Sequence, residues 1–321
     1  MSFDVLSSAM RYISKWLDLE NIEEIAINKP GEICIRLAGK RTAPWVFEND
    51  ADLTRDYLTD LLYIVANTYE IPFDPVLGSP VVFAALPQGH RFTGIAGRNV
   101  MYDNDDLQGG IAISIRKFRA GVDFGFEDYG LEIGKTLTKV VKKEAQYIDD
   151  AYERFMTIIK NREPLLISGA TSTGKTTFLN NILGMLSPDL RIITVEDTRE
   201  LIVKQRNHVH VVLSRTEQSN SFNYAQVIDL IVRMTPDTII GGEISTENAA
   251  AIWELMGTGH NNFLASIHAE SPMAAYNGFI DRITHTYPNL ERSKLFEEMK
   301  QRLHVVQISR EGNLRAVTDV V

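Results

Sequence analysis

The chain has 321 residues, of which 44% are hydrophobic and 23% charged, proportions that are ordinary for a globular protein of two domains. A net charge of -9 argues against a protein whose main partner is the phosphate backbone of a nucleic acid, and the single cysteine, Cys34, excludes an intrachain disulfide and a multi-cysteine zinc site. No stretch reaches the roughly 18 apolar residues of a membrane span, and the N-terminus lacks a basic segment followed by an apolar one, so we expect no secretory signal.

The first part of the chain, residues 1–119, is predicted to form an α+β domain. Apolar residues recur at helical spacing in some segments and alternate with polar residues in others. Helices are predicted over 4–19 and 52–69, and strands over 24–28, 32–37, 81–86 and 111–117. The turn Lys29-Pro30-Gly31 has the chemistry of a type II turn, so the first two strands should form a hairpin.

Residues 120–143 are predicted to be a linker, because they begin with a stretch rich in glycine and charge without a clear period. From residue 144 to 321, helical and strand patterns alternate. Helices are predicted from 144 to the break at 162–164 and over 176–183, 223–234 and 249–256, and strands over 165–167, 191–195, 208–213, 238–240 and 263–267. This alternation predicts an α/β domain with a mostly parallel, doubly wound sheet.

The most specific motif joins the strand at 165–167 to the helix at 176–183. Gly169, Gly174, Lys175 and Thr176 complete the phosphate-loop pattern G-x-x-x-x-G-K-[ST]. The glycines let backbone N–H groups turn toward an anion, while Lys175 and the helix N-terminus add positive charge and Thr176 offers a hydroxyl to Mg²⁺. The predicted ATP-binding residues are Gly169, Ala170, Thr171, Ser172, Thr173, Gly174, Lys175, Thr176 and Thr177.

Three further predicted strands end in polar groups, at Glu196-Asp197, Gly242-Glu243 and His268. Ligands of open parallel sheets bind beyond the carboxyl ends of the strands. Glu243 is therefore a candidate to hold Mg²⁺ through water or to direct the attacking water, and Glu196 is a second acidic candidate for these roles. His268 is a candidate sensor of the γ-phosphate. With Lys175 they form the predicted catalytic set; the alternative is surface carboxylates and a structural histidine.

Other polar groups are less specific. Arg91 follows a turn and Arg116 ends a strand, so both could project from the edge of the first domain, although surface solvation explains any single arginine. His208 and His210 share one face of a strand, and without a third ligand nearby in the sequence they do not favour zinc.

Four segments, in this order and spacing, resemble the secretion-ATPase superfamily, and most closely the hexameric traffic ATPases of type IV secretion and conjugation systems. They are the Walker A motif at 169–177, an acidic box at 193–201, a Walker B region at 233–243 and a His box at 257–269. Segments 28–31, 86–91 and 114–117 resemble the N-terminal half of the same family. The resemblance therefore covers nearly the whole chain.

The resemblance implies a RecA-like ATPase domain at 144–321, ATP and Mg²⁺ as cofactors, and a homohexamer of two stacked rings that powers type IV secretion or conjugative transfer. It further implies partners among the inner-membrane components of the apparatus and a cytoplasmic location, peripheral at the inner membrane, without stable nucleic-acid binding. By resemblance, Arg91 and Arg116 become candidate phosphate or interface contacts, and Arg199 or Arg215 candidate residues acting in trans.

One departure keeps alternatives open. After Glu243 the family usually has an apolar residue and then arginine, whereas this chain has Ile244 and Ser245. A hexameric scaffold that binds nucleotide as a switch with little turnover is therefore an alternative.

A pilus-retraction-type motor is the nearest rival within the superfamily. Type II secretion and pilus-assembly ATPases usually carry a four-cysteine zinc subdomain, which the single cysteine of this chain excludes. A nucleic-acid motor is disfavoured by the acidic balance and by the lack of clusters of aromatic and basic residues.

Overall fold

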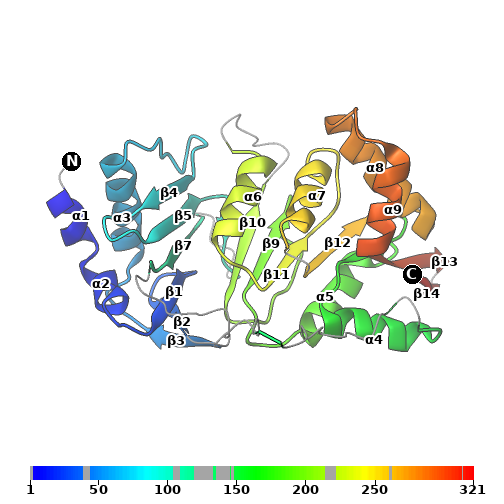
Figure 1. The fold of residues 1–321 in the computed structure, drawn as a ribbon, viewed down its shortest axis with the longest axis horizontal. Coiled ribbons are helices and arrows are strands. Elements are labelled where there is room, and N and C mark those ends of the chain that lie inside the picture. Colours follow the sequence, from blue (N-terminus) through cyan, green and yellow to red (C-terminus); the bar gives the residue numbers. More distant parts are fainter. Residues whose placement is uncertain are drawn as a thin grey trace. The chain divides into compact units, whose positions relative to one another are not determined.

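The structure is a computed structural model that describes residues 3–38, 44–103, 109–118, 133–134, 145, 148–213, 222–259, 262–312 and 314–321. It consists of two compact units, Met1–Lys143 and Glu144–Val321, the first coloured from blue toward green and the second from green to red in Figure 1. The predicted linker at 120–143 lies outside the described residues except at 133–134. Among the described residues, no helix has the length and apolar character needed to cross a membrane.

The N-terminal unit is an antiparallel sheet with helices, which confirms the predicted α+β character. Its elements are α1 (Phe3–Ala9), α2 (Arg11–Leu17), β1 (Ile22–Ile27), β2 (Glu32–Leu37), β3 (Trp45–Asn49), α3 (Arg55–Thr68), β4 (Val81–Ala85), β5 (Arg91–Gly97), β6 (Val100–Met101) and β7 (Gly110–Arg116). The sheet has the order β3-β2-β1-β7-β5-β4, with every neighbouring pair antiparallel. Its core is mostly aliphatic and includes Ile25, Leu62 and Ile113, each with none of its surface exposed.

Local chemistry explains two features of this unit. Gly31 has a φ of +79°, the left-handed conformation that the third residue of a type II turn requires, so the predicted hairpin of β1 and β2 forms. The helix predicted over 4–19 is interrupted: Met10 has a ψ of -2°, well away from the helical value near -42°, and separates α1 from α2. The buried residues Leu6, Ile13 and Leu17 of both pieces still reach the core.

The C-terminal unit is a mostly parallel sheet with helices between its strands, as predicted (Figure 1). Its elements are α4 (Ala151–Asn161), β8 (Leu165–Ser168), α5 (Lys175–Met185), β9 (Ile192–Glu196), β10 (His208–Val212), α6 (Tyr224–Arg233), β11 (Thr238–Gly241), α7 (Ala249–Gly257), β12 (Phe263–Ile267), α8 (Pro272–Thr286), α9 (Arg292–Arg302), β13 (His304–Glu311) and β14 (Leu314–Val320). The strands follow the order β14-β13-β8-β12-β11-β9-β10, parallel from β13 to β10, with β14 antiparallel to β13.

Strand β8 lies inside this sheet, between β12 and β13, and positions the phosphate loop. Leu165, Leu166 and Ile167 are completely buried, as the continuous apolar run of an interior parallel strand predicts. Because β8, β9, β11, β12 and β13 run parallel, their carboxyl ends meet at one edge, where the polar groups predicted from the sequence follow the strands.

Two parts of the unit differ from the sequence-based predictions. Helix α4 begins at Ala151 rather than 144, because Asp150 caps it by accepting a hydrogen bond from Glu153 N at 2.7 Å. Beyond residue 268 no element was predicted, whereas the structure forms α8, α9 and the hairpin β13–β14. The hairpin extends the sheet next to β8, with His304 to Gln307 in register with Leu165 to Ser168.

Candidate nucleotide-binding site

The loop between β8 and α5 requires both glycines of its motif. A Cβ at Gly169 would lie 2.5 Å from Thr173 Oγ1 and 2.6 Å from the carbonyl oxygen of Ile308, which leaves no room for a side chain. Gly174 has a φ of +94°, a left-handed conformation that favours glycine. Thr173 Oγ1 donates to the carbonyl oxygen of Ala170 at 2.9 Å and closes the loop on itself. The loop therefore has a defined shape at the N-terminus of α5.

Lys175 points into this loop and is 93% shielded from solvent, its exposed fraction being 7%. Its ammonium donates to the carbonyl oxygens of Gly169 at 2.9 Å and Ala170 at 3.1 Å, and lies 3.0 Å from His268 Nδ1. Burial lowers the pKa of Lys175, while the nearby Glu243 carboxylate acts in the opposite direction. The ammonium thus lies where a phosphate oxygen would accept from it.

His268 connects Lys175 to Glu243. An ammonium can only donate, so His268 Nδ1 accepts from Lys175 and its proton is on Nε2. This assigns the tautomer with the proton on Nε2, the nitrogen that lies 3.2 Å from Glu243 Oε2. The side chains of His268 and Glu243 are 39% and 35% exposed, so a ligand can reach both. Three of the four predicted catalytic residues, Lys175, His268 and Glu243, therefore lie in one row of polar contacts.

Glu196 has a different environment from Glu243. Its side chain is 2% exposed, and Oε2 accepts from the backbone N–H of Glu200 at 2.7 Å and of Leu201 at 2.8 Å. Oε1 accepts from Thr194 Oγ1 at 2.9 Å. Burial alone would raise the pKa of Glu196. The hydrogen bonds and charge of His210 and the two backbone N–H groups lower this pKa by more than burial raises it, so the net pKa is lowered. Glu196 is an ionised carboxylate that holds the loop after β9.

That loop brings a further acidic residue to the start of α5. Thr176 Oγ1 donates to Glu200 Oε2 at 3.2 Å, and Asn180 Nδ2 donates to the Glu200 carbonyl oxygen at 3.2 Å. Sequence reasoning did not single out Glu200, although it lies in the acidic box four residues after Glu196. Thr176, Glu200 and Glu243 supply hydroxyl and carboxylate oxygens around one cavity, the donor set that Mg²⁺ prefers, so the site fits this ion.

These groups line a cavity of about 660 Å³, within the range of small-molecule sites. Its wall combines the phosphate loop and the strand ends, among them Ser172, Lys175, Thr176, Glu196, Glu243 and His268. The sequence predicts that these distant segments meet at one edge of the sheet. In the structure they line the same cavity.

The turn after β11 is fixed by Asn248. Its Nδ2 donates to the Glu243 carbonyl oxygen at 2.7 Å, and its Oδ1 accepts from Ser245 N at 2.8 Å. Ser245, which replaces the arginine usual in the family, donates from Oγ to Glu247 Oε2 at 2.7 Å. The backbone that carries Glu243 is thus held independently of the Ser245 side chain.

The predicted arginines fall into three situations. Arg91 and Arg116 are exposed and directly opposite each other on the antiparallel strands β5 and β7, so the N-terminal unit pairs them on one face. Arg199 donates to the carbonyl oxygen of Leu201 and lies 3.8 Å from Glu196 Oε1, so it is engaged in its own loop. A role in trans would require Arg199 to leave these contacts. Arg215 lies outside the described residues.

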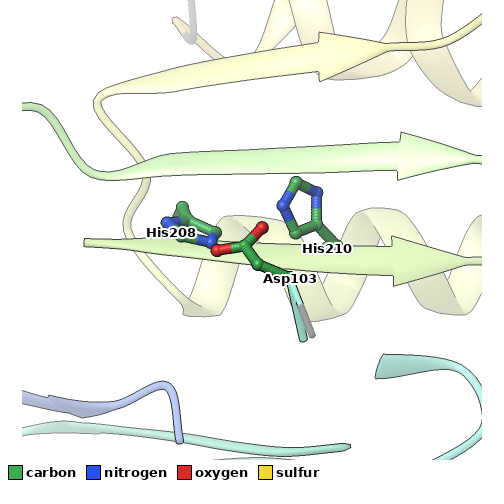
Figure 2. A group of neighbouring side chains, drawn as sticks. All are labelled: Asp103, His208 and His210. Carbon is green, nitrogen blue, oxygen red and sulfur yellow. The ribbon is translucent and has the colours of Figure 1, made fainter. Parts of the chain in front are cut away.

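His208 and His210 lie along β10, with ring centroids 4.9 Å apart (Figure 2). His210 is completely buried, and its Nδ1 lies 2.7 Å from Thr194 Oγ1 and 3.6 Å from Glu196 Oε1. His208 Nδ1 lies 2.6 Å from the carbonyl oxygen of Gln205. His210 therefore contacts the buried Glu196 carboxylate and the Thr194 hydroxyl that donates to it.

A phosphate loop at the carboxyl end of an interior parallel strand, with carboxylates at the ends of its neighbours, defines a P-loop protein with a RecA-like α/β domain. The family model described as "Type II/IV secretion system protein" matches residues 134–303, and the chain belongs to this family, as a type IV secretion traffic ATPase.

Curated relatives agree with this assignment. The chain is 25% identical over 281 residues to "Protein VirB11" of Rhizobium radiobacter, covering 83% of this chain and 78% of the relative. It is 27% identical over 246 residues to "Conjugal transfer protein TrbB" of the same organism, covering 75% and 67%. The crystal structure of the VirB11 ATPase of the Brucella suis type IV secretion system, in complex with sulphate, superposes with a TM-score of 0.82 at 22% identity, over 98% of this chain and 94% of that one. This superposition supports the fold.

Proposed function

We propose that this type IV secretion ATPase hydrolyses ATP with Mg²⁺, assembles as a homohexameric ring, and thereby powers type IV secretion or conjugative transfer. The row of Lys175, His268 and Glu243 at the mouth of the phosphate loop carries this proposal. It combines a cation, a hydrogen-bonding imidazole and an accessible carboxylate, the groups that phosphoryl transfer to water needs.

Each residue has a distinct part in the proposed reaction. Lys175 and the amides of residues 169–177 bind the β- and γ-phosphates. Thr176, Glu200 and Glu243 would hold Mg²⁺, which neutralises charge on the phosphates when bound. Glu243 orients the attacking water, and His268 turns its Nε2–H from Glu243 to donate to an oxygen of the γ-phosphate. Glu196 keeps the loop that carries Glu200 in place.

We also propose that the arginine pair of the N-terminal unit is a phosphate or interface contact. An arginine that reaches the transferring phosphate is worth about 10³–10⁵ in turnover in well-studied NTPases. Arg91 and Arg116, exposed and side by side on β5 and β7, are suited to bind a phosphate together. Inner-membrane components of the secretion apparatus remain the proposed partners, at the cytoplasmic face of the membrane.

The proposal is tested with the purified full chain and the variant Lys175→Ala. Phosphate release at saturating ATP and Mg²⁺ should fall by about 100-fold or more, because the variant loses the cation at the phosphates. Lys300→Ala, an exposed lysine on α9, is the matched control and should keep the parent rate. Equal far-ultraviolet circular dichroism spectra would show that both variants fold. Hydrolysis by Lys175→Ala at the parent rate would refute the site.

Ser245 keeps the nucleotide-switched scaffold as a second candidate function. Because Asn248 holds the Glu243 backbone without the usual arginine, we expect turnover to persist. Several phosphates released per chain would exclude a pure switch, whereas tight ATP binding with less than one turnover would favour it. Mass measurement with and without ATP and Mg²⁺ tests the hexamer.

A further inference from the structure

The hairpin of β13 and β14 carries two arginines at its tip. Arg310 and Arg315 are direct cross-strand partners, and opposed residues of an antiparallel pair project to the same face. Both are exposed, and within the described part of the chain neither guanidinium lies within ion-pair distance of a carboxylate. Like charges placed opposite each other destabilise a sheet. An anion on this face would offset the repulsion.

The arginine pair lies directly beside the phosphate loop. Arg310 Nη1 is 3.4 Å from the carbonyl oxygen of Ser172. A Cβ built at Gly174 would lie 3.4 Å from Arg315 Cδ and 3.6 Å from Arg315 Nε, so the Arg315 side chain covers that glycine. The two guanidinium groups therefore border the loop whose amides would bind phosphate.

The sheet order gives the direction of a nucleotide in this loop. Strand β13 lies on one side of β8, and β12 and β11, followed by His268 and Glu243, lie on the other. If the γ-phosphate is bound near His268 and Glu243, the α-phosphate and the nucleoside extend toward the hairpin. Arginine forks match the geometry of phosphate oxygens.

We propose that Arg310 and Arg315 bind the α-phosphate of the nucleotide from within the same subunit. The inference rests on the proposed ATPase function and adds residues that the sequence motifs do not include. The α-phosphate is common to ATP and ADP and is not the reacting group. Contacts to it stabilise the ground state and the transition state equally, so their loss raises KM.

The test compares the full-length protein with Arg315→Gln, which keeps a polar side chain and removes its charge. Affinities for ADP and for a non-hydrolysable ATP analogue are measured by titration calorimetry, and KM and kcat by phosphate release. We expect the affinity for both nucleotides to fall by about tenfold, as for one charge-assisted hydrogen bond, and the loss of kcat/KM to reside in KM. Arg315→Lys should recover part of the affinity.

Arg302→Gln is the matched control, because Arg302 is exposed and lies just before the opposite end of β13. Its affinities should equal those of the parent. Unchanged ADP affinity in Arg315→Gln would overturn the inference, as would weakening confined to the ATP analogue or a loss of kcat at constant KM. If Lys175→Ala also bound nucleotide like the parent, the proposed ATP site itself would fail, so the two failures are distinguishable.

Discussion

Replacing Glu196 by glutamine tests whether this carboxylate organises the acidic loop. Glutamine has the same shape but no charge, and one of its terminal atoms becomes an NH₂ donor. In the structure both oxygens of Glu196 accept, from the backbone N–H groups of Glu200 and Leu201 and from Thr194 Oγ1. The amide can keep its oxygen on the backbone N–H groups only by turning its NH₂ toward Thr194 and His210.

The expected destabilisation follows from these contacts. A hydrogen bond to a charged group contributes about 1.5–3 kcal/mol, and breaking a buried charged network costs about 3–5 kcal/mol when one partner is removed. Because glutamine retains part of the network, we expect the free energy of unfolding to fall by about 3 kcal/mol. In a domain of this size each kcal/mol shifts Tm by about 2–4 °C, so Tm should fall by about 6–12 °C.

The pH dependence gives a second signature. The pKa of Glu196 is lowered in the folded state, so its contribution is fully present above the ordinary value of 4.5 and is lost as pH falls through the lower folded-state value. Calorimetric melting curves of both proteins from neutral pH to about pH 3 should therefore show a Tm difference that narrows below 4.5.

Glu297→Gln, an exposed carboxylate on α9, is the control and should change stability by less than about 0.5 kcal/mol. The reasoning is refuted if Glu196→Gln melts within about 1 °C of the parent, or if its Tm difference stays constant with pH. A variant of parental stability that no longer releases phosphate would instead assign water activation to Glu196.

Two further predictions concern the loop and the metal. Gly169→Ala should lower Tm and abolish nucleotide binding, because the new Cβ would lie 2.6 Å from the Ile308 carbonyl oxygen. A Cβ at Gly184 would have no neighbouring atom within 4 Å, so Gly184→Ala should stabilise α5 by about 0.5 kcal/mol. Thermal melting and ADP titration of the pair check this; equal behaviour of the two variants would contradict it. Chelation of divalent cations should stop phosphate release and added Mg²⁺ should restore it, and full turnover in excess chelator would exclude the oxygen donors of Thr176, Glu200 and Glu243 as a metal site.

The sequence predicts the parts of the fold in which the hydrophobic pattern is strong. The apolar run of β8 and the alternation of strands and helices up to β12 give the parallel sheet, because interior strands are buried on both faces. Among the C-terminal elements that were not predicted, α8 has a helical pattern in its buried Tyr276, Phe279, Ile280 and Ile283, whereas α9 and β14 lack a pattern. Helix α9 buries only Leu295 and Met299, and along β14 every side chain before Val320 is exposed, so neither period is visible in the sequence.

The candidate site shows the same division. Lys175, Glu243 and His268 could be predicted together because parallel strands bring their carboxyl ends to one edge. The role of Glu196 could not, since its partners are backbone N–H groups of a loop whose path only the structure gives. Arg315 follows the phosphate loop by more than a hundred residues and reaches it only through the pairing of β13 with β8.

Glu196 and Glu243 both come at the end of a strand predicted from the sequence, but their surroundings in the structure differ. Glu196 is 2% exposed and its oxygens accept from donors of its own loop and strand, so its carboxylate is almost closed to a ligand. Glu243 is 35% exposed, and one of its oxygens lies 3.2 Å from His268 Nε2. Of these two carboxylates, Glu243 is therefore the accessible acceptor for water or a hydrated metal. Replacing Glu196 should therefore lower mainly the free energy of unfolding, and replacing Glu243 should lower mainly the rate of phosphate release.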